Sequence, residues 1–204
     1  MACIRCWRGG RAFFLSQTPL TLAETASVFG EMLTFQALLA RTTDKPARRA
    51  LLAGKAEDML NTVVRQIAFY SFEQKVHEKR RQGELTADDI SALWLEIQRE
   101  SLGPAVKQNE GYDSYWCYIS HFIHAPFYVY AYAFGDCLVN ALYARYEAEP
   151  SGFGEKYLTL LEAGGTRGHR ELLKPFGLDA TDPKFWSLGL DRIAGIIDEL
   201  EAMG

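Results

Sequence analysis

Apolar residues recur three and four positions apart along most of the chain from Thr21 onward. That spacing brings them to one face of an α-helix, and no stretch alternates apolar and polar residues for long enough to indicate a β-strand. The pattern therefore predicts an all-α fold, a multi-helix bundle. The helices that we expect occupy residues 21–41, 46–82, 86–101, 126–149, 152–163, 168–175 and 183–203.

Capping and helix-breaking residues set the expected starts of three helices. Thr86, with Asp89 three residues later, has the spacing of an N-terminal cap. Pro126 and Pro183 stand where a proline suits the first turn of a helix. These residues predict where the third, fourth and last helices begin.

Two stretches are less regular. Residues 46–82 predict either one long helix or a kinked pair, with Gly54 as the candidate break. Residues 103–125 combine glycine, proline, polar and aromatic residues without a sustained period, which predicts a long loop. Loops of this length are uncommon inside compact domains and are often functional, so chemistry is expected near this one.

Composition narrows the class of protein without identifying it. The chain has 204 residues, of which 48% are hydrophobic and 24% charged, so it can bury a core without disulfides, and we expect one domain. Its formal net charge of -4 at pH 7 gives no general attraction for phosphate backbones or anionic lipids. No apolar run approaches the roughly 20 residues that span a bilayer. We therefore expect a cytoplasmic protein with no nucleic-acid partner and no membrane partner.

Two glutamates are the first candidates for chemistry. Glu24 and Glu31 are seven residues apart, close to two helical turns, so both carboxylates fall on one stripe of the first helix with Val28 and Phe35. A carboxylate on a burying face needs a metal ion or a cationic partner. The alternative is a capping box, in which Glu24 satisfies the backbone N–H of Thr21. The spacing alone favours the cap.

A histidine and three tyrosines form the second candidate group. His121 lies just ahead of the helix that Pro126 opens, and Tyr128 and Tyr132, four residues apart, share one stripe of that helix. Tyr130 lies on a neighbouring stripe. Phenol and imidazole can both hydrogen-bond to a developing negative charge while they stay neutral, which suits the stabilisation of an oxyanion. The alternative is an aromatic core helix whose hydroxyls reach water or backbone carbonyls.

Several longer motifs resemble those of one known family. The motifs are TPLTLAETASVFGEMLTF, RQIAFYSFE, RRQGELT, HFIHAPFYVYAYAFGD and ELLKPFGLDATDPKFW. Together they resemble, in order, the C-terminal portion of oligoendopeptidase F, a zinc metallopeptidase related to the thimet oligopeptidase type. The resemblance covers residues 13–204 and implies the C-terminal part of a helical peptidase catalytic domain. Residues 1–12 resemble nothing in the family, and we expect them to be a disordered N-terminal tail.

The resemblance implies a zinc-dependent metalloendopeptidase that hydrolyses oligopeptides. In this family the third zinc ligand is the first glutamate of an E-x-x-S-x-x-x-E helix, a pattern that Glu24, Ser27 and Glu31 match here. The resemblance therefore implies that Glu24 binds zinc and that Glu31 supports the site. It also implies that His121 and a tyrosine of the following helix face the metal and stabilise the tetrahedral intermediate. The candidate tyrosines are Tyr128 and Tyr132, with Tyr130 behind them.

The chain departs from the family in one respect that bears on activity. The family takes two histidines and a general-base glutamate from an HExxH helix ahead of the third ligand. Here the 23 residues before Glu24 contain no histidine, and no HExxH occurs elsewhere. His77 and Glu78 fail the spacing because Arg81 stands where the second histidine is needed. A shifted reading frame upstream of Phe13, or a wrongly chosen start, would produce this pattern, and the encoding DNA tests the hypothesis.

The departure predicts how the chain behaves alone. We expect it to be inactive and unable to retain zinc, because a catalytic zinc needs about three protein ligands. The chain should also expose apolar surface that the rest of an enzyme would cover, around the cleft that Glu24, His121 and the tyrosines are expected to line. Such surface favours self-association. The competing interpretation is a non-catalytic helical protein that binds peptides or partners through the same aromatic surface.

Overall fold

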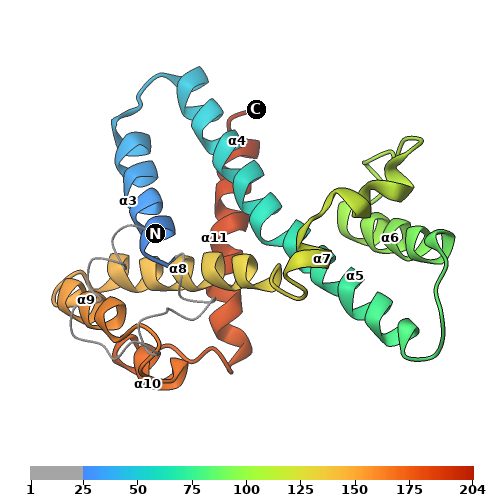
Figure 1. The fold of residues 1–204 in the computed structure, drawn as a ribbon. Coiled ribbons are helices and arrows are strands. Elements are labelled where there is room, and N and C mark those ends of the chain that lie inside the picture. The colour runs from blue at the N-terminus through green and yellow to red at the C-terminus, as the bar shows by residue number, and fades with distance from the viewer. Residues whose placement is uncertain (1–24) are drawn as a thin grey trace. The chain divides into compact units, whose positions relative to one another are not determined.

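The computed structural model describes residues 25–204, so Glu24 and the expected tail of residues 1–12 lie outside the described residues. Helices make up the regular structure of this part of the chain and no β-strand occurs in it, which confirms the predicted all-α class (Figure 1). No helix in residues 25–204 is long and apolar enough to cross a membrane. The helices are α3 (Thr25–Arg41), α4 (Lys45–Thr62), α5 (Val64–Arg80), α6 (Ala87–Leu102), α7 (His121–His124), α8 (Tyr130–Ala148), α9 (Phe153–Ala163), α10 (His169–Leu173) and α11 (Pro183–Ala202), with the 3₁₀ turns η3 (Tyr112–Tyr118) and η4 (Lys174–Phe176).

Two of the predicted helix starts are confirmed by their capping contacts. The backbone N–H of Asp89 donates to Thr86 Oγ1 (3.2 Å), and the backbone N–H of Thr86 donates to the Asp89 carboxylate (2.9 Å), which completes a capping box ahead of α6. Asp182 caps α11 by accepting a hydrogen bond from the backbone N–H of Lys184, with Pro183 in the first turn. Both starts depend on residues close together in sequence, which is why the sequence predicts them.

The stretch predicted as one long helix or a kinked pair is a pair, but its break lies at Val63 and not at Gly54. Gly54 lies inside α4, where the alanine and leucine residues around it carry the helix through a single glycine. Val63 and Val64 are consecutive β-branched residues, which lose χ1 freedom in a helix and weaken it locally. Val63, at the break, is also fully buried.

The long loop predicted over residues 103–125 is wrong in part, because the segment contains η3 and α7. Two tryptophans tie η3 to α6. The indole N–H of Trp94 donates to the backbone carbonyl of Tyr112 (2.9 Å), and that of Trp116 donates to Ser91 Oγ (3.1 Å). These partners are far apart in sequence, so local composition does not reveal the ordering that they impose.

The helix predicted to start at Pro126 starts instead at Tyr130. Phe127 has a φ of 60°, in the left-handed region that a bulky side chain rarely adopts, and a residue in this conformation interrupts a right-handed helix. Residues 126–129 therefore form a turn that joins α7 to α8.

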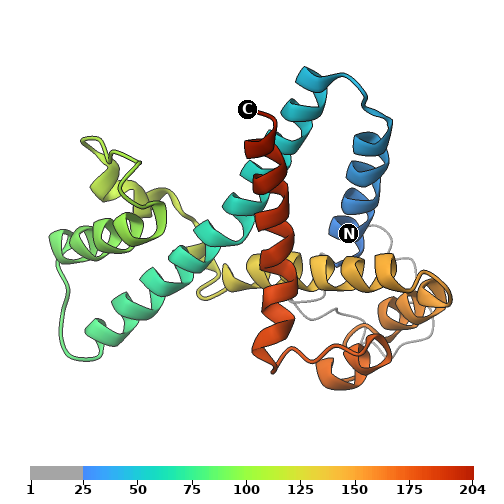
Figure 2. The same ribbon diagram turned by 180° about the vertical axis from the view of Figure 1, so that it is seen from behind.

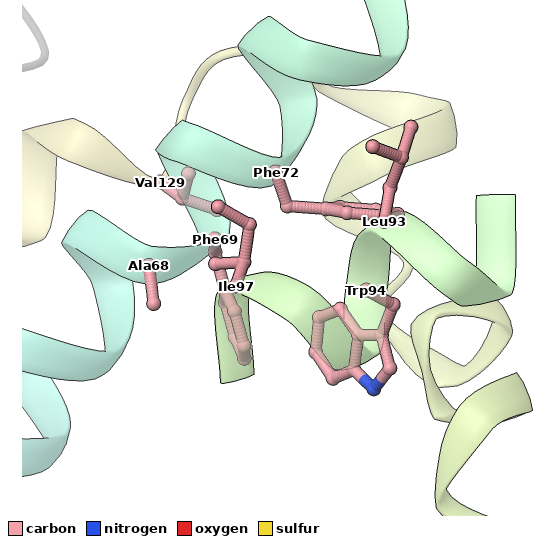
Figure 3. Close-up of a cluster of buried hydrophobic side chains, with 7 residues drawn as sticks. All are labelled: Ala68, Phe69, Phe72, Leu93, Trp94, Ile97 and Val129. Carbon is pink, nitrogen blue, oxygen red and sulfur yellow. The ribbon is translucent and has the colours of Figure 1, made fainter. Parts of the chain in front are cut away.

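The described residues fall into two compact units, and residues 61–133 form the one that we call the central unit. In it, α5 and α6 lie side by side (Figures 1 and 2). Trp94 is fully buried in their core, with its ring centroid 5.5 Å from that of Phe69 and 5.3 Å from that of Phe72 (Figure 3). The core residues of this unit are Ala68, Phe69, Phe72, Leu93, Trp94, Ile97 and Val129.

The other unit, which we call the terminal unit, combines residues 25–60 with residues 134–204. Figures 1 and 2 show α11 crossing α8 within it. At the crossing a Cβ on Gly189 would lie 3.0 Å from the Cα of Cys137, so the close approach of the helices depends on the missing side chain. Phe29 of α3 packs on α8 and α9, with its ring centroid 6.1 Å from that of Tyr143 and 4.5 Å from that of Tyr157.

Candidate functional site

His121, Tyr128 and Tyr132 meet in the central unit, and we call these three residues the imidazole–phenol cluster. The Tyr132 hydroxyl lies 3.4 Å from His121 Nε2. The three rings contact one another in pairs, with centroid distances between 5.2 and 5.9 Å. All three side chains are half-buried. The fold thus brings together three of the residues that the sequence selects.

The cluster forms by a different route from the predicted one. His121 is the first residue of α7, Tyr128 lies in the turn at residues 126–129, and only Tyr132 lies on α8. The expectation that both tyrosines share one helical stripe is therefore wrong. The left-handed backbone of Phe127 turns the chain so that the rings of Tyr128 and His121 stack, with an interplanar angle of 28°.

Tyr130, the third candidate tyrosine, lies apart from the contacts that define the cluster. Its side chain is exposed, and its ring centroid lies 5.8 Å from that of Tyr70 on α5. This position agrees with the separate stripe on which the sequence places it.

A buried glutamate lies beside the turn that carries Tyr128. Glu73 of α5 is 2% exposed, and its Oε1 accepts a hydrogen bond from the backbone N–H of Phe127 at 2.8 Å. Burial raises the pKa of the Glu73 carboxyl, while the Phe127 N–H and the imidazoles of His77 and His121 act in the opposite direction. This carboxyl is the polar anchor of the turn.

Of the two glutamates predicted to form the metal site, Glu31 lies within the described residues. It pairs with a lysine. Its side chain is 57% exposed, and its Oε1 accepts a hydrogen bond from Lys55 Nζ at 2.8 Å. The buried stripe of α3 includes Phe29, Met32 and Phe35, and Glu31 stands about 100° around the helix from Met32. The prediction that Glu31 lies on the burying face is therefore wrong. Its carboxylate does have a cationic partner, which is Lys55.

Lys55 is buried, although lysine usually is not. It is 6% exposed, and its Nζ also contacts Asp58 at 3.3 Å. Burial alone would lower the pKa of Lys55, but the hydrogen bond and charge of Glu31, together with Asp58, outweigh burial and raise it. These three residues line part of a groove of about 570 Å³ between α3 and α4.

Asp136 of α8 is the acid buried next to these charges. It is 4% exposed, and its Oδ2 accepts a hydrogen bond from the Asn140 side chain at 2.9 Å. Burial raises the pKa of Asp136 to about 6, Lys55 opposes that rise, and the carboxylates of Asp58 and Glu31 add to it. Asp136 therefore titrates in a range where most aspartates are already ionised.

Glu73 and Lys55 are not among the residues selected from spacing, although the sequence contains a signal for both. Glu73 follows Phe69 by four residues and Lys55 follows Leu52 by three, which are core positions of an amphipathic helix. Lysine and glutamate are almost never fully buried unless they are paired, so a charge on such a stripe indicates a partner elsewhere in the fold. The partner itself, Phe127 in the first case, cannot be identified from spacing.

The described residues do not fit a zinc site by themselves. Within residues 25–204, no three His, Cys, Asp or Glu side chains are arranged to hold a metal ion. Glu24, the predicted ligand, lies outside that part of the chain, and the sequence contains no HExxH. A catalytic zinc takes about three protein ligands, and the described residues do not supply them together. What the imidazole–phenol cluster itself can offer a substrate is hydrogen bonds. A phenol and an imidazole can both donate to one oxygen atom that lies within reach of each.

Comparison with known proteins extends these observations to the chain as a whole. The family model of peptidase family M3 matches residues 11–191. The plasmid oligoendopeptidase F of Lactococcus lactis subsp. cremoris is 30% identical over 197 residues, which are 96% of this chain and 33% of that protein. The oligopeptidase PepF of Bacillus subtilis strain 168 is 28% identical over 183 residues, which are 89% of this chain and 27% of that protein.

The fold has the same relatives. The crystal structure of oligoendopeptidase-F from Enterococcus faecium superposes with a TM-score of 0.81 at 27% identity, and the match covers 91% of this chain and 36% of that one. The chain thus spans about a third of the length of the curated relatives that it matches. The resemblance inferred from the sequence motifs is confirmed, and the chain belongs to peptidase family M3.

Proposed function

We propose that this chain supplies the substrate-facing portion of a zinc-dependent metalloendopeptidase that hydrolyses oligopeptides in the cytoplasm. Residues 13–204 form the C-terminal part of the catalytic domain, and residues 1–12 lie outside it. An HExxH helix from another polypeptide segment completes the metal site, to which this chain contributes Glu24, supported by Glu31. The observation that carries the proposal is the meeting of His121 with Tyr128 and Tyr132.

Two members of the cluster suit the charge that develops during peptide hydrolysis. Attack on a peptide carbonyl places negative charge on its oxygen in a tetrahedral intermediate. The Tyr132 hydroxyl and the His121 imidazole lie 3.4 Å apart, so both can direct hydrogen bonds to one substrate oxygen that lies within reach of each. Neutral donors held in place before the reaction stabilise the transition state without reorganisation. Tyr128, stacked on His121, is the alternative donor.

The second candidate function is peptide binding without cleavage. It is favoured for the chain alone by the lack of a three-ligand metal grouping in residues 25–204. The two functions differ in whether hydrolysis appears once the HExxH segment is supplied.

Complementation tests the proposal. The purified chain is mixed with a polypeptide that carries an HExxH helix of the family, and cleavage of a quenched fluorescent peptide is followed together with zinc content. We expect neither zinc retention nor cleavage by the chain alone, and both after mixing. Tyr132→Phe should then lower kcat by about 10²–10³-fold with little change in KM, which is the effect of removing one oxyanion donor.

Matched variants decide what the result means. Tyr118→Phe removes a hydroxyl from a side chain that is 77% exposed and should leave cleavage unchanged. Glu24→Gln should abolish the recovered cleavage and the zinc content together. If the two polypeptides associate but no peptide is cleaved, the hydrolytic proposal is wrong and peptide binding replaces it. If Tyr132→Phe and His121→Ala both cleave at the normal rate, the oxyanion-stabilising role of the imidazole–phenol cluster is wrong.

A further inference from the structure

Glu73 is an acid buried in an aromatic core, which requires a physical reason. It lies on the face of α5 that carries Phe69 and Phe72, and it is 2% exposed. Burying a carboxyl is unfavourable unless hydrogen bonds compensate. Glu73 Oε1 accepts such a bond from the backbone N–H of Phe127, 54 residues along the chain, with an N–O distance of 2.8 Å, while Oε2 is buried without a hydrogen-bond partner among the described residues.

Phe127 is a residue whose backbone must be held. Within residues 25–204 it is the one non-glycine residue with a positive φ, at 60°. A large side chain in the left-handed region is strained and persists only where surrounding contacts enforce it. Glu73 supplies the contact to its backbone.

The side chain of Phe127 is held by the same helix. Its ring centroid lies 4.8 Å from that of His77 and 6.1 Å from that of Tyr70. Tyr70, Glu73 and His77 are spaced three and four residues apart, so they share one face of α5. That face contacts Phe127 at its ring and at its N–H, which fixes both the position of the residue and its conformation.

The conformation of Phe127 decides where the imidazole–phenol cluster lies. Phe127 directly precedes Tyr128 and stands between α7, which begins with His121, and α8, which carries Tyr132. A change in its φ would re-aim the Tyr128 side chain and shift α7 with respect to α8. The 3.4 Å separation of Tyr132 Oη and His121 Nε2 depends on that geometry.

We propose that Glu73 is a positioning residue for the imidazole–phenol cluster, which acts by holding the strained backbone of Phe127 through a buried hydrogen bond. The catalytic meaning of this role rests on the proposed function, but the structural role does not. The neighbouring imidazoles of His77 and His121 also lie close enough to influence the carboxyl, so charge alone is the competing explanation. The experiment therefore has to separate the effect of side-chain length at position 73 from the effect of its charge.

Two substitutions make that separation. Glu73→Gln removes the charge but keeps a side-chain oxygen at the same distance from the backbone of α5. Glu73→Asp keeps the charge, but its side chain is shorter by one methylene, which draws the carboxylate back from Phe127. Hydrogen–deuterium exchange of the Phe127 amide is measured in the purified chain, with helix content followed by circular dichroism. We expect Glu73→Asp to exchange at least about tenfold faster at Phe127 and Glu73→Gln to stay near the parent rate. Glu78→Asp, an exposed acid one turn further along α5, should leave that amide unchanged.

Activity of the complemented enzyme gives the second readout. Glu73→Asp should lower kcat by about 10²-fold with KM nearly unchanged, since a small misplacement of a catalytic group has an effect of that size. Glu73→Gln should keep the kcat of the parent. The inference is overturned if Glu73→Asp keeps the slow exchange, or if Glu73→Gln loses it as Glu73→Asp does. Exchange is measured without hydrolysis, so a failure of complementation leaves this test intact.

Discussion

At the scale of single residues, Gly189 sets how closely two helices of the terminal unit approach. A Cβ there would lie 3.0 Å from the Cα, 3.2 Å from the Cβ and 3.3 Å from the carbonyl oxygen of Cys137. Backbone atoms of a buried helix cannot move away cheaply. We expect Gly189→Ala to lower the free energy of unfolding by about 1–3 kcal/mol, the usual effect of overpacking, in urea titrations.

Gly195 of the same helix provides the matched control. Nothing lies within 4 Å of the position that its Cβ would occupy. Alanine is the better helix former, so Gly195→Ala should raise the free energy of unfolding by up to about 1 kcal/mol. Equal effects of the two substitutions would show that close packing at Gly189 is not responsible.

Some residues of the candidate site can be identified from the sequence, and others cannot. His121 and Tyr132 are found from their residue types, since few side chains can donate a hydrogen bond while neutral, and the fold does bring them together. The buried pairing of Glu73 with Phe127 joins residues 54 positions apart, so no local pattern contains it. Sequence can show that Glu73 needs a partner, and only the fold supplies the partner's identity.

At the scale of helices, local signals predict boundaries well and long-range packing overrides them. The starts predicted at Thr86 and Pro183 are confirmed because the hydrogen bonds that cap these helices span three and two residues. The start predicted at Pro126 is wrong because Phe127, held by α5, adopts a left-handed conformation. The break predicted at Gly54 lies instead at the buried Val63, next to a second β-branched residue.

Helix α8 carries a titrating group that should make stability depend on pH. Burial raises the pKa of Asp136 from its usual value of 3.8 to about 6 in the folded protein, so the protonated carboxyl is the form that folding favours. Its contribution to stability is complete below the unfolded pKa and is lost as pH rises through about 6. Between pH 4 and pH 7 this loss should be on the order of 2 kcal/mol.

Asp136→Asn removes the ionisation and keeps a side-chain oxygen that can accept from Asn140. The free energy of unfolding of this variant, measured at several pH values, should exceed that of the parent progressively from pH 4 to pH 7. Asp191→Asn, on the exposed face of α11, serves as the control and should follow the parent. A difference between Asp136→Asn and the parent that does not vary with pH would contradict the assignment.

At the scale of the whole molecule, the chain corresponds to about a third of its relatives and exposes apolar side chains. On α3, Leu33 is 38% and Leu38 is 49% exposed, and Leu38 borders the groove of about 570 Å³ between α3 and α4. We expect the chain to self-associate in a concentration-dependent manner, measured by sedimentation equilibrium, because contiguous apolar surface drives association.

A charge placed in the groove should reverse that behaviour. Leu38→Lys should weaken self-association, whereas Leu158→Lys, at a similarly exposed position on α9, should not. Addition of the HExxH-bearing polypeptide should also replace homo-association with a mixed complex. A monomeric chain at all concentrations would remove this expectation.

The family and the fold class of the whole molecule could be predicted from sequence because long motifs and helical periodicity extend over most of it. The expected meeting of Glu24 with His121 in one cleft stays a prediction, since Glu24 lies outside the described residues. Assembly of such a site depends on contacts between distant segments, which periodicity does not encode.

The left-handed turn at Phe127 has a consequence for how this sequence can vary over evolution. His121 and Tyr132 lie 11 positions apart, and their approach depends on one strained residue gripped by α5. Side chains in this stretch can be exchanged, but an inserted or deleted residue would change where the turn at residues 126–129 directs the chain and would separate the two aromatic groups. The stretch should therefore be constant in length among family members that keep both rings in contact.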